Sequence, residues 1–520
     1  KRLKMPTGKR PRSEPHVDAV DATDVLYRRT LRTLVSVVAE KELPGRVLRG
    51  GHAIDGSYFF TWQDGKSVTS EDVKMLTHGL QALIASDIPI ESTHLPYGEA
   101  VAYFEKREMA ASLALIKSRV TSNVDVHSIA GTLRLAIFPL VTSTGKASPC
   151  PHLMPYQDGL LVVFHNSDGP LASFVPSPTL TLSFKDHKAW GDIHGTHSVG
   201  HLNQLKAVGR EFHDFVLHAE FRQEAKLALL AQTISRKNDS LSTSKDRIGV
   251  ICIAGPTSSG KTTFANKLAM YLANAGYHAV PLTVDHYYLP LDRQPKYQAR
   301  QLRSDVDYDA IEAMDLDLVN EQVNALLRGE EVLTPVYNMK TGYRDGKGKP
   351  FRLRNRGHSI LVLEGIHSLN PSYTSSVTEC KVFRIYISPL SALQIDETNA
   401  IRTTDHRLLR RMCRDFLFRG HDASRTLSMW DNVRRGEHRW IFPHQDNVDW
   451  VMNSGMEYEL RVLKPFVEPL LAAVEPSDAV YPKAQALLRM LSLVNSASSH
   501  IVPSASLLRE FIGDGAFDFH

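Results

Sequence analysis

Cysteine is scarce in this sequence. The 520 residues include four cysteines, Cys150, Cys252, Cys380 and Cys413. They form no C-x-x-C pair and show no Cys/His spacing typical of zinc ligands. A disulfide framework or a zinc site is therefore not indicated, and a reducing, intracellular compartment fits the sequence.

Long hydrophobic runs are missing too. No apolar run approaches the ~18 residues of a membrane-spanning helix, and the basic first residues lack the apolar core of a secretory signal. We therefore expect an intracellular protein, cytoplasmic or mitochondrial, that is not secreted and has no membrane partner. The first residue is lysine rather than methionine, which loss of an organellar presequence or of a flexible terminus would each explain.

Neither sign of charge dominates. The formal net charge is only +4, so the overall charge does not require a nucleic-acid partner. Hydrophobic residues make up 42% and charged residues 23%, the composition of an ordinary folded protein. At about 150 residues per domain, a chain of this length predicts several domains.

A glycine-rich loop near the middle of the chain carries the strongest signal. The apolar run 248–254 leads directly into residues 255–262, whose spacing satisfies G-x-x-x-x-G-K-[ST]. In such a P-loop, backbone N–H groups close around phosphates, Lys261 reaches the β- and γ-oxygens, and the Thr262 hydroxyl completes a Mg²⁺ shell. Helical spacing follows until Gly276, so the loop leads into the positive end of a helix. The residues expected to bind ATP are Gly255, Pro256, Thr257, Ser258, Ser259, Gly260, Lys261, Thr262 and Thr263.

Apolar strands alternate with helical segments after residue 247. This alternation predicts an α/β fold with a parallel sheet covered by helices on both faces. The strands are expected at 248–254, 279–284, 360–364, 381–387 and 447–452. Because ligands of such sheets bind at the carboxyl ends of the strands, residues that directly follow each run are candidates for chemistry.

Two carboxylates stand at such strand ends. Asp285 follows the second strand, across from the P-loop, where it can accept the proton of a substrate hydroxyl that attacks the γ-phosphate. Glu364 ends the third strand, where it can hold Mg²⁺ directly or through water. A helix-capping or surface role is the alternative for each.

Arginines gather within residues 402–415, with Arg419 beyond. Such a run is usually a solvated helix face or an RNA-binding strip. Downstream of a P-loop, however, arginines on a mobile helix can neutralise the charge that spreads over phosphoryl oxygens. Residues 305–309 and the strand and loop at 334–344 are expected to face the acceptor pocket.

Together these motifs resemble the uridine kinase and phosphoribulokinase group of P-loop kinases, especially its longer members with a preceding threonyl-tRNA-synthetase-like domain. The resemblance rests on the P-loop and on residues 284–288, 363–371, 403–411 and 428–443. It implies that Asp285 is the general base and that Glu364 serves Mg²⁺. It further implies lid arginines at Arg407, Arg410 and Arg411 and an acceptor pocket at Asp307, Tyr337, Tyr288 and Arg344.

The acceptor pocket departs from this group. Uridine–cytidine kinases carry Asp-Phe after the pocket tyrosine and a base-contacting histidine a few residues on. Here Asn338-Met339 and then Gly342 take these places, and the loop around Asp307 is about two residues longer. ATP binding is thus expected, whereas specificity for a pyrimidine nucleoside stays open.

The remaining segments complete the predicted domains. Residues 1–23 carry prolines and charges without apolar periodicity, as in a disordered basic arm. Residues 24–237 are expected to form an α+β domain with a β-rich extension, and 238–246 a polar linker. The kinase domain then spans 247–475, and 476–520 form a helical tail that packs on the kinase core or contacts another subunit of a homo-oligomer.

The first domain also resembles a known family. Residues 24 to about 130, especially 51–104, are similar to the second additional domain of threonyl- and alanyl-tRNA synthetases. In those enzymes a histidine pair and a Cys-x-x-x-His motif hold a metal, and the domain hydrolyses mischarged tRNA. Here residues 27–33 lack the paired histidines, and no Cys-x-x-x-His follows. We therefore expect the editing-domain fold without its chemistry.

A histidine cluster offers another candidate metal site. His194, His197 and His201 have i, i+3, i+7 spacing, which could place three imidazoles on one helical face. Gly195 and Gly200 break such a helix, however, and no carboxylate or cysteine completes a metal shell.

Two hypotheses follow. The first is an ATP- and Mg²⁺-dependent kinase that phosphorylates a hydroxyl of a nucleoside-like or other small acceptor. The alternative is an RNA- or ribosome-associated protein that uses the kinase-like fold for nucleotide sensing or as a scaffold. The intact Lys261, Thr262, Asp285 and Glu364 favour the first, and the altered base pocket favours the second.

Overall fold

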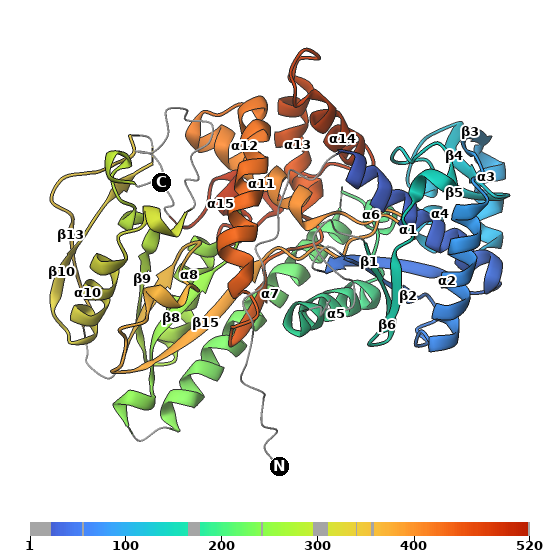
Figure 1. The fold of residues 1–520 in the computed structure, drawn as a ribbon. Helices are drawn as coiled ribbons and strands as arrows, with labels where there is room; N and C mark the ends of the chain where they lie inside the picture. Colours follow the sequence, from blue (N-terminus) through green and yellow to red (C-terminus); the bar gives the residue numbers. More distant parts are fainter. Residues whose placement is uncertain are drawn as a thin grey trace.

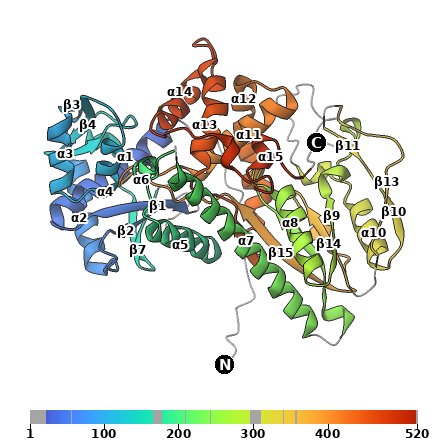
Figure 2. The ribbon, with the colours of Figure 1, turned by 180° about the vertical axis from the view of Figure 1, so that it is seen from behind.

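The protein folds into two lobes joined by long helices (Figures 1 and 2). The computed structural model describes residues 22–54, 57–164, 177–207, 209–240, 243–294, 310–339, 341–354 and 358–517. We call the described part of 22–164 the N-terminal lobe and the described part of 243–517 the C-terminal lobe. The predicted arm at 1–23 falls almost entirely outside the described residues.

The N-terminal lobe is α+β, as predicted. One antiparallel sheet has the order β1 (Leu48–Ile54), β2 (Ser57–Trp62), β7 (Gly159–Val163), β6 (His152–Tyr156), and a second has the order β3 (Ile90–Pro96), β4 (Asn123–Ile129), β5 (Thr132–Leu135). The helices are α1 (Ala22–Glu42), α2 (Ser70–Ala85), α3 (Tyr97–Lys106) and α4 (Ala110–Lys117). Helix α2 begins after Thr69, whose side chain accepts the Asp72 N–H while Asp72 accepts the Thr69 N–H, a capping box.

Three helices lead from one lobe to the other: α5 (Pro178–Ile193), α6 (Val199–Gln204) and α7 (Arg210–Asp239). Helix α5 thus lies within the domain at 24–237, for which the sequence predicts a β-rich extension. His194 caps the end of α5, while His201 lies in α6. Within the described residues, no group of three or more His, Cys, Asp or Glu side chains is placed to hold a metal ion.

A five-stranded parallel sheet forms the centre of the C-terminal lobe, which confirms the α/β prediction. Its order is β16 (Trp450–Asn453), β15 (Lys381–Ser388), β8 (Ile248–Ala254), β14 (Ser359–Glu364), β9 (His278–Thr283). Strand β8 is central, and β14 separates it from β9, the next of these strands along the chain. The carboxyl ends of β8, β14 and β9 therefore meet at one edge, where α/β sheets bind ligands.

Alternate residues of the central strand face two different helix layers. Ile251 and Ile253 pack in a core with α7 and with Phe264 and Leu268 of α8 (Lys261–Asn274). Val250 and Cys252 face the opposite core, which contains α10 (Leu316–Leu327). Both faces of the sheet are thus buried, as the continuous apolar strand predicts.

The other elements of this lobe surround the sheet edge. Helices α11 (Thr403–Arg419) and α12 (Ala423–Gly436) follow β15, and α13 (Glu459–Ala472) follows β16. Two short antiparallel ribbons pair β10 (Glu331–Thr334) with β13 (Lys349–Arg352) and β11 (Tyr337–Asn338) with β12 (Tyr343–Arg344). The tail forms α14 (Tyr481–Leu491) and α15 (Arg509–Ile512), which pack against α13 and α11 respectively. The tail therefore folds back on α13 and α11 of the same lobe.

Besides the connecting helices, a loop of the C-terminal lobe, residues 389–402, contacts the N-terminal lobe. This loop precedes α11. The buried Glu397 of this loop accepts the Ala111 N–H at 2.8 Å and the Ser112 N–H at 3.2 Å, so it caps α4 of the other lobe. Its backbone oxygen accepts the Gly50 N–H of β1 at 2.7 Å.

Of the helices in the described residues, none is both long and apolar enough to cross a bilayer.

Candidate active site

The P-loop is fixed between β8 and α8 by a close backbone approach. A Cβ on Gly255 would overlap the carbonyl oxygen of Ile387 in β15, so glycine alone lets the loop leave the sheet here. Gly260, which ends the loop, has φ +84°, a left-handed conformation that glycine adopts without strain. The strand, loop and helix predicted from the motif are all present.

Lys261 and Thr262 lie at the start of α8. The Lys261 ammonium donates to the carbonyl oxygens of Gly255 and Pro256 at 3.2 and 3.3 Å, and burial lowers its pKa. The Thr262 hydroxyl donates to Glu364 Oε1 at 3.3 Å. The side chain expected to reach phosphate and the hydroxyl expected to bind Mg²⁺ are thus held at the end of the central strands.

Asp285 and Glu364 lie together beside Lys261. Asp285 follows β9, and its Oδ1 lies 3.0 Å from the position that a Cβ on Gly365 would take. Burial, followed by the neighbouring Asp285 charge, raises the pKa of Glu364 to about 7, and burial raises the pKa of Asp285. Lys261 opposes both shifts. The four residues singled out for catalysis and metal binding therefore share one buried electrostatic environment.

These groups fit a Mg²⁺ ion. Hard cations prefer oxygen ligands, and the Thr262 hydroxyl and Glu364 supply them, with Asp285 beside them. Asp285 Oδ1 is buried and has no hydrogen-bond partner among the described residues, as expected of an oxygen meant for a ligand. Because Mg²⁺ usually keeps waters and phosphate oxygens as ligands, this small set is sufficient.

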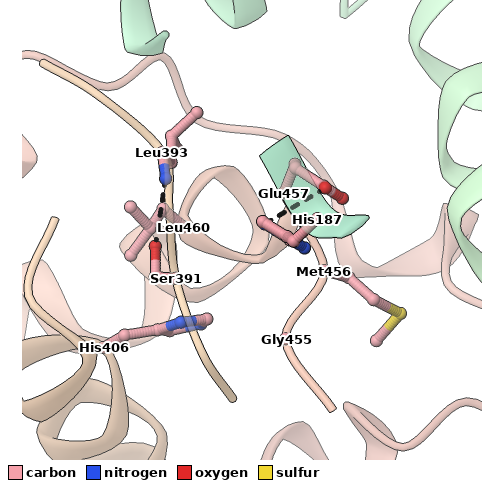
Figure 3. Close-up of a pocket in the computed structure, with 8 residues that line it drawn as sticks. All are labelled: His187, Ser391, Leu393, His406, Gly455, Met456, Glu457 and Leu460. Atoms are coloured by element: carbon pink, nitrogen blue, oxygen red, sulfur yellow. Dashed lines mark hydrogen bonds and ion pairs between the residues drawn. The ribbon is translucent and has the colours of Figure 1, made fainter. Parts of the chain in front are cut away.

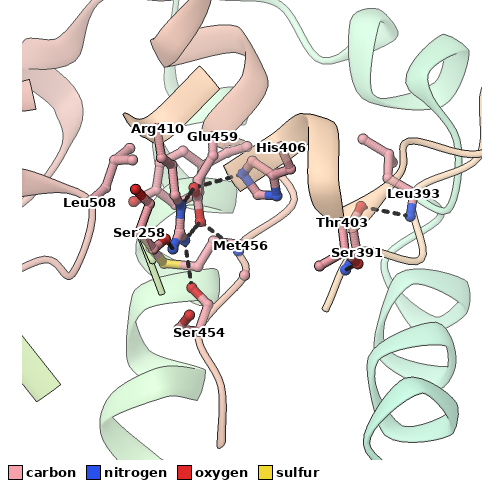
Figure 4. A network of polar contacts seen from close by, with 12 residues as sticks. Ser258, Ser391, Leu393, Thr403, His406, Arg410, Ser454, Met456, Glu459 and Leu508 are labelled. Carbon is pink, nitrogen blue, oxygen red and sulfur yellow. Dashed lines mark hydrogen bonds and ion pairs between the residues drawn. The ribbon is translucent and has the colours of Figure 1, made fainter. Parts of the chain in front are cut away.

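The predicted lid arginines contact the P-loop backbone. Arg407 is buried against Glu437 and donates to the Thr257 carbonyl at 2.9 Å. Arg410 binds both oxygens of Glu459, at 2.7 and 2.6 Å, and donates to the Ser258 carbonyl at 3.2 Å (Figure 4).

Arg411 completes this set. It binds Asp415 at 3.1 Å and reaches the Thr257 hydroxyl at 3.4 Å. Arg407 and Arg410 therefore hold the loop in shape through its carbonyls, and each has a buried glutamate as its counter-charge.

Arg414 is a basic residue that the sequence analysis did not single out. It lies one turn beyond Arg410 on α11, and its charge acts on both Lys261 and Asp285. Burial and the neighbouring Arg419 lower its pKa to about 10. Its Nε has no hydrogen-bond partner among the described residues, and its nearest acid, Asp415, lies 3.8 Å away. The sequence feature that could have indicated Arg414 is its helical spacing from Arg410 and Arg411.

The acceptor side is built from the loop after β9 and from the β11–β12 ribbon. The rings of Tyr288 and Tyr337 lie 5.4 Å apart between centroids, and His286 Nδ1 accepts the Tyr337 N–H at 3.3 Å. Arg344 donates to the carbonyls of Tyr287 and Tyr288, so it fixes the loop that carries Asp285. Asp307 lies outside the described residues.

A small pocket lies at the junction of α5 and the segment before α13 (Figure 3). Its buried pair is His187 and Glu457, 3.2 Å apart, and burial lowers the pKa of His187 to about 3 and raises that of Glu457 to about 7. His406 also lines it and binds Glu459 at 2.8 Å. The pocket thus connects to the P-loop through the Glu459–Arg410 pair, but it holds none of the predicted site residues.

Known proteins match the segment that contains this site. Residues 250–460 match the model of the Phosphoribulokinase / Uridine kinase family. A uridine kinase of Schizosaccharomyces pombe is 28% identical over 217 residues, 42% of this chain and 42% of the yeast protein. A uridine kinase of Halobacterium salinarum is 28% identical over 206 residues, 39% of this chain and 80% of that protein. The chain therefore spans less than half of the first relative's length and most of the second's.

A solved structure described as a possible uridine kinase from Bacillus stearothermophilus covers 31% of this chain and 79% of its own, at 18% identity and a TM-score of 0.24. A score this low supports no argument, so the fold rests on the sheet order given above. The resemblance of residues 24–130 to a tRNA-synthetase domain lies outside the family match and stays a prediction. The phosphoribulokinase/uridine kinase family match covers the chain from β8 to the first residues of α13, and this segment contains Lys261, Asp285, Glu364 and the arginines of α11.

Proposed function

We propose that this protein is an ATP- and Mg²⁺-dependent kinase that transfers the γ-phosphoryl group to a hydroxyl of a nucleoside-like or other small acceptor. The observation that carries the proposal is the convergence of Lys261, Thr262, Glu364 and Asp285 at the carboxyl ends of three neighbouring strands. A P-loop alone would suit any nucleotide-binding protein. A buried carboxylate beside the P-loop lysine is what phosphoryl transfer to a hydroxyl additionally requires.

The roles of these residues follow from their positions. The first amides of α8 and Lys261 would bind the β- and γ-phosphates. Thr262 and Glu364 would hold Mg²⁺, which supplies charge neutralisation on the phosphates when bound.

Asp285 would accept the proton of the acceptor. As the acceptor oxygen bonds to the γ-phosphorus, the bond from that phosphorus to the β–γ bridging oxygen breaks and ADP leaves. The acceptor proton passes to Asp285 Oδ1, whose buried oxygen has no hydrogen-bond partner among the residues described.

A nucleoside-like acceptor is supported by the uridine kinase relatives and by the paired tyrosines. Tyr288 directly follows the turn that carries Asp285, and the ring of Tyr337 lies 5.4 Å from the Tyr288 ring between centroids, so a flat base could stack at these rings. The Asn338 and Gly342 departures leave the base unspecified. Neither the site nor the comparisons favour the RNA-associated alternative, and homo-oligomerisation stays a prediction.

The test is ADP release by the purified full chain with a panel of nucleosides and small alcohols. We expect acceptor-dependent turnover that Asp285→Asn lowers by about 10²- to 10⁴-fold, because a general base contributes on that order. Asp317→Asn, which neutralises an exposed carboxylate near the start of α10, is the matched control and should keep wild-type turnover. Turnover equal in both variants would remove Asp285 from the mechanism.

A further inference from the structure

The C-terminal tail places a carboxylate on the P-loop helix. Glu510 Oε2 accepts the backbone N–H of Thr263 at 3.2 Å and the Thr263 hydroxyl at 2.8 Å, and both residues are buried. One turn further along α8, the Lys267 ammonium donates to the Ala505 carbonyl at 2.8 Å. Leu507 lies 3.6 Å from the position that a Cβ on Gly260 would take. The tail therefore runs along α8 from its first turn.

The amide that Glu510 occupies is one that a phosphate would need. The first N–H groups of a helix have no partner within the helix and attract anions. In α8, the Phe264 N–H already donates to the Gly260 carbonyl at 3.0 Å, so the amides left for an anion are those of residues 261–263. Glu510 takes the last of these, together with the neighbouring hydroxyl.

Other groups of the loop are still without partners. The hydroxyls of Ser258 and Ser259 belong to residues 2% and 0% exposed, and neither has a hydrogen-bond partner among the described residues. Buried polar atoms without partners are rare in folded proteins unless a ligand or water satisfies them. The loop is thus suited to an anionic ligand. The Glu510 carboxylate of the tail contacts Thr263, and the Ser258 and Ser259 hydroxyls have no hydrogen-bond partner among the described residues.

A nucleotide and Glu510 would also repel each other. Glu510 acts electrostatically on Lys261 and Glu364, so it belongs to the same buried group of charges as Asp285. A triphosphate brings several further negative charges into this region. Coulomb repulsion is stronger in a buried site than in water, so phosphate and the Glu510 carboxylate cannot share Thr263 without a large cost.

We propose that Glu510 is an internal competitor for the phosphate site, so that nucleotide binds only when this carboxylate leaves Thr263. The inference rests on the proposed function, because it assumes that phosphates enter the P-loop. It makes the tail a regulator of nucleotide affinity.

The movement that this requires is small. Arg509 donates to the carbonyls of Ser499 and Val502 at 3.0 and 2.6 Å, which anchors the residue next to Glu510 to the segment 499–502. Phe511 is fully buried beside Arg410, whose guanidinium lies 4.9 Å from its ring centroid. Because the neighbours of Glu510 are anchored, the proposal requires its side chain, rather than the tail backbone, to leave the Thr263 amide.

The test is calorimetric titration of the full chain with ATP and Mg²⁺. Glu510→Gln keeps the size of the side chain and one acceptor oxygen but removes the charge. We expect it to tighten ATP binding by about 10-fold or more, the effect of one lost charge-assisted contact. Glu475→Gln removes an equal charge from an exposed site beyond α13 and should leave the affinity unchanged.

Each outcome has a distinct meaning. Measurable wild-type binding that Glu510→Gln leaves unchanged or weakens overturns the competitor role and leaves the proposed kinase function standing. No binding by the wild type or any variant, including Lys261→Ala, overturns the proposed function and the inference with it. Should Glu510→Gln fail to fold by circular dichroism, Glu510→Asp withdraws the carboxylate by one methylene and must still tighten binding; an unchanged affinity there also refutes the proposal.

Discussion

The buried pair of Glu459 and Arg410 should be a major source of stability for the P-loop. Both side chains are 0% exposed, and Glu459 accepts from Arg410 Nε and Nη2 at 2.7 and 2.6 Å, from the Met456 N–H at 2.8 Å, and contacts His406 at 2.8 Å. We predict that Glu459→Gln lowers the free energy of unfolding by roughly 3–5 kcal/mol, because it leaves the Arg410 charge buried without a counter-charge.

The pKa of Glu459 reflects the same contacts. Burial alone would raise it, but Arg410 and His406 outweigh burial and lower the pKa to about 2 from its ordinary 4.5. This difference is worth about 3 kcal/mol at neutral pH. Because the folded-state pKa lies below the unfolded one, the stabilisation is present above pH 4.5 and is lost as the pH falls from 4.5 towards 2.

Urea unfolding of five variants tests the argument: Glu459→Gln, Arg410→Met, Glu459→Met, the double methionine variant and Glu105→Gln. Replacing both partners, Arg410→Met with Glu459→Met, should cost less than either single change, because no charge is left unpaired. Glu105→Gln, which removes one partner of an exposed ion pair with Lys117, is the control and should change stability by at most about 1 kcal/mol. If Glu459→Gln unfolds at the same urea concentration as this control, or keeps its full effect at pH 2, the reasoning is wrong.

Two further predictions concern the backbone of the site and the contact between the lobes. Gly255→Ala should lower the melting temperature and abolish ATP binding, because its Cβ would overlap the Ile387 carbonyl; Gly98→Ala, where a Cβ meets no atom within 4 Å, should do neither. Glu397→Gln should reduce stability by about 1–3 kcal/mol, since it weakens charge-assisted bonds to the buried first turn of α4. Faster amide exchange at Ser112 would confirm the Glu397 prediction, and unchanged exchange there would contradict it.

The parallel sheet could be predicted from the sequence because its signals are local. Each buried strand is a short apolar run, and the predicted run 248–254 is the observed β8. Helix α5 was missed because its apolar periodicity is weak. Leu180, Phe184 and His187 are buried at helical spacing, but the last is a histidine that relies on a distant partner, Glu457. Tertiary contacts, rather than local pattern, explain this helix.

The predicted site likewise combines residues that local sequence patterns indicate with residues that only the tertiary fold brings together. The P-loop spacing and the carboxylates at two strand ends are sequence features, so Lys261, Asp285 and Glu364 could be named in advance. The acid that neutralises Arg410 lies 49 residues away, and Glu510 lies 247 residues from Thr263. No local pattern indicates such pairings, because they arise only when α13 and the tail fold over α11 and α8.

These pairings change which basic residues can serve phosphoryl transfer. To turn towards a phosphate, Arg407 and Arg410 would each have to break a buried ion pair, with Glu437 and Glu459 respectively. Arg434 and His406 also contact these glutamates, but breaking a buried pair of this kind is costly. The Lys261 ammonium, by contrast, donates to two carbonyl oxygens, and the Arg414 guanidinium lies 3.8 Å from Asp415 and is also acted on by the charge of Glu510. In the proposed reaction, charge that develops on the γ-phosphoryl oxygens would be met by Lys261, Arg414 and Mg²⁺, while the two inner arginines would keep the loop in the shape that receives it.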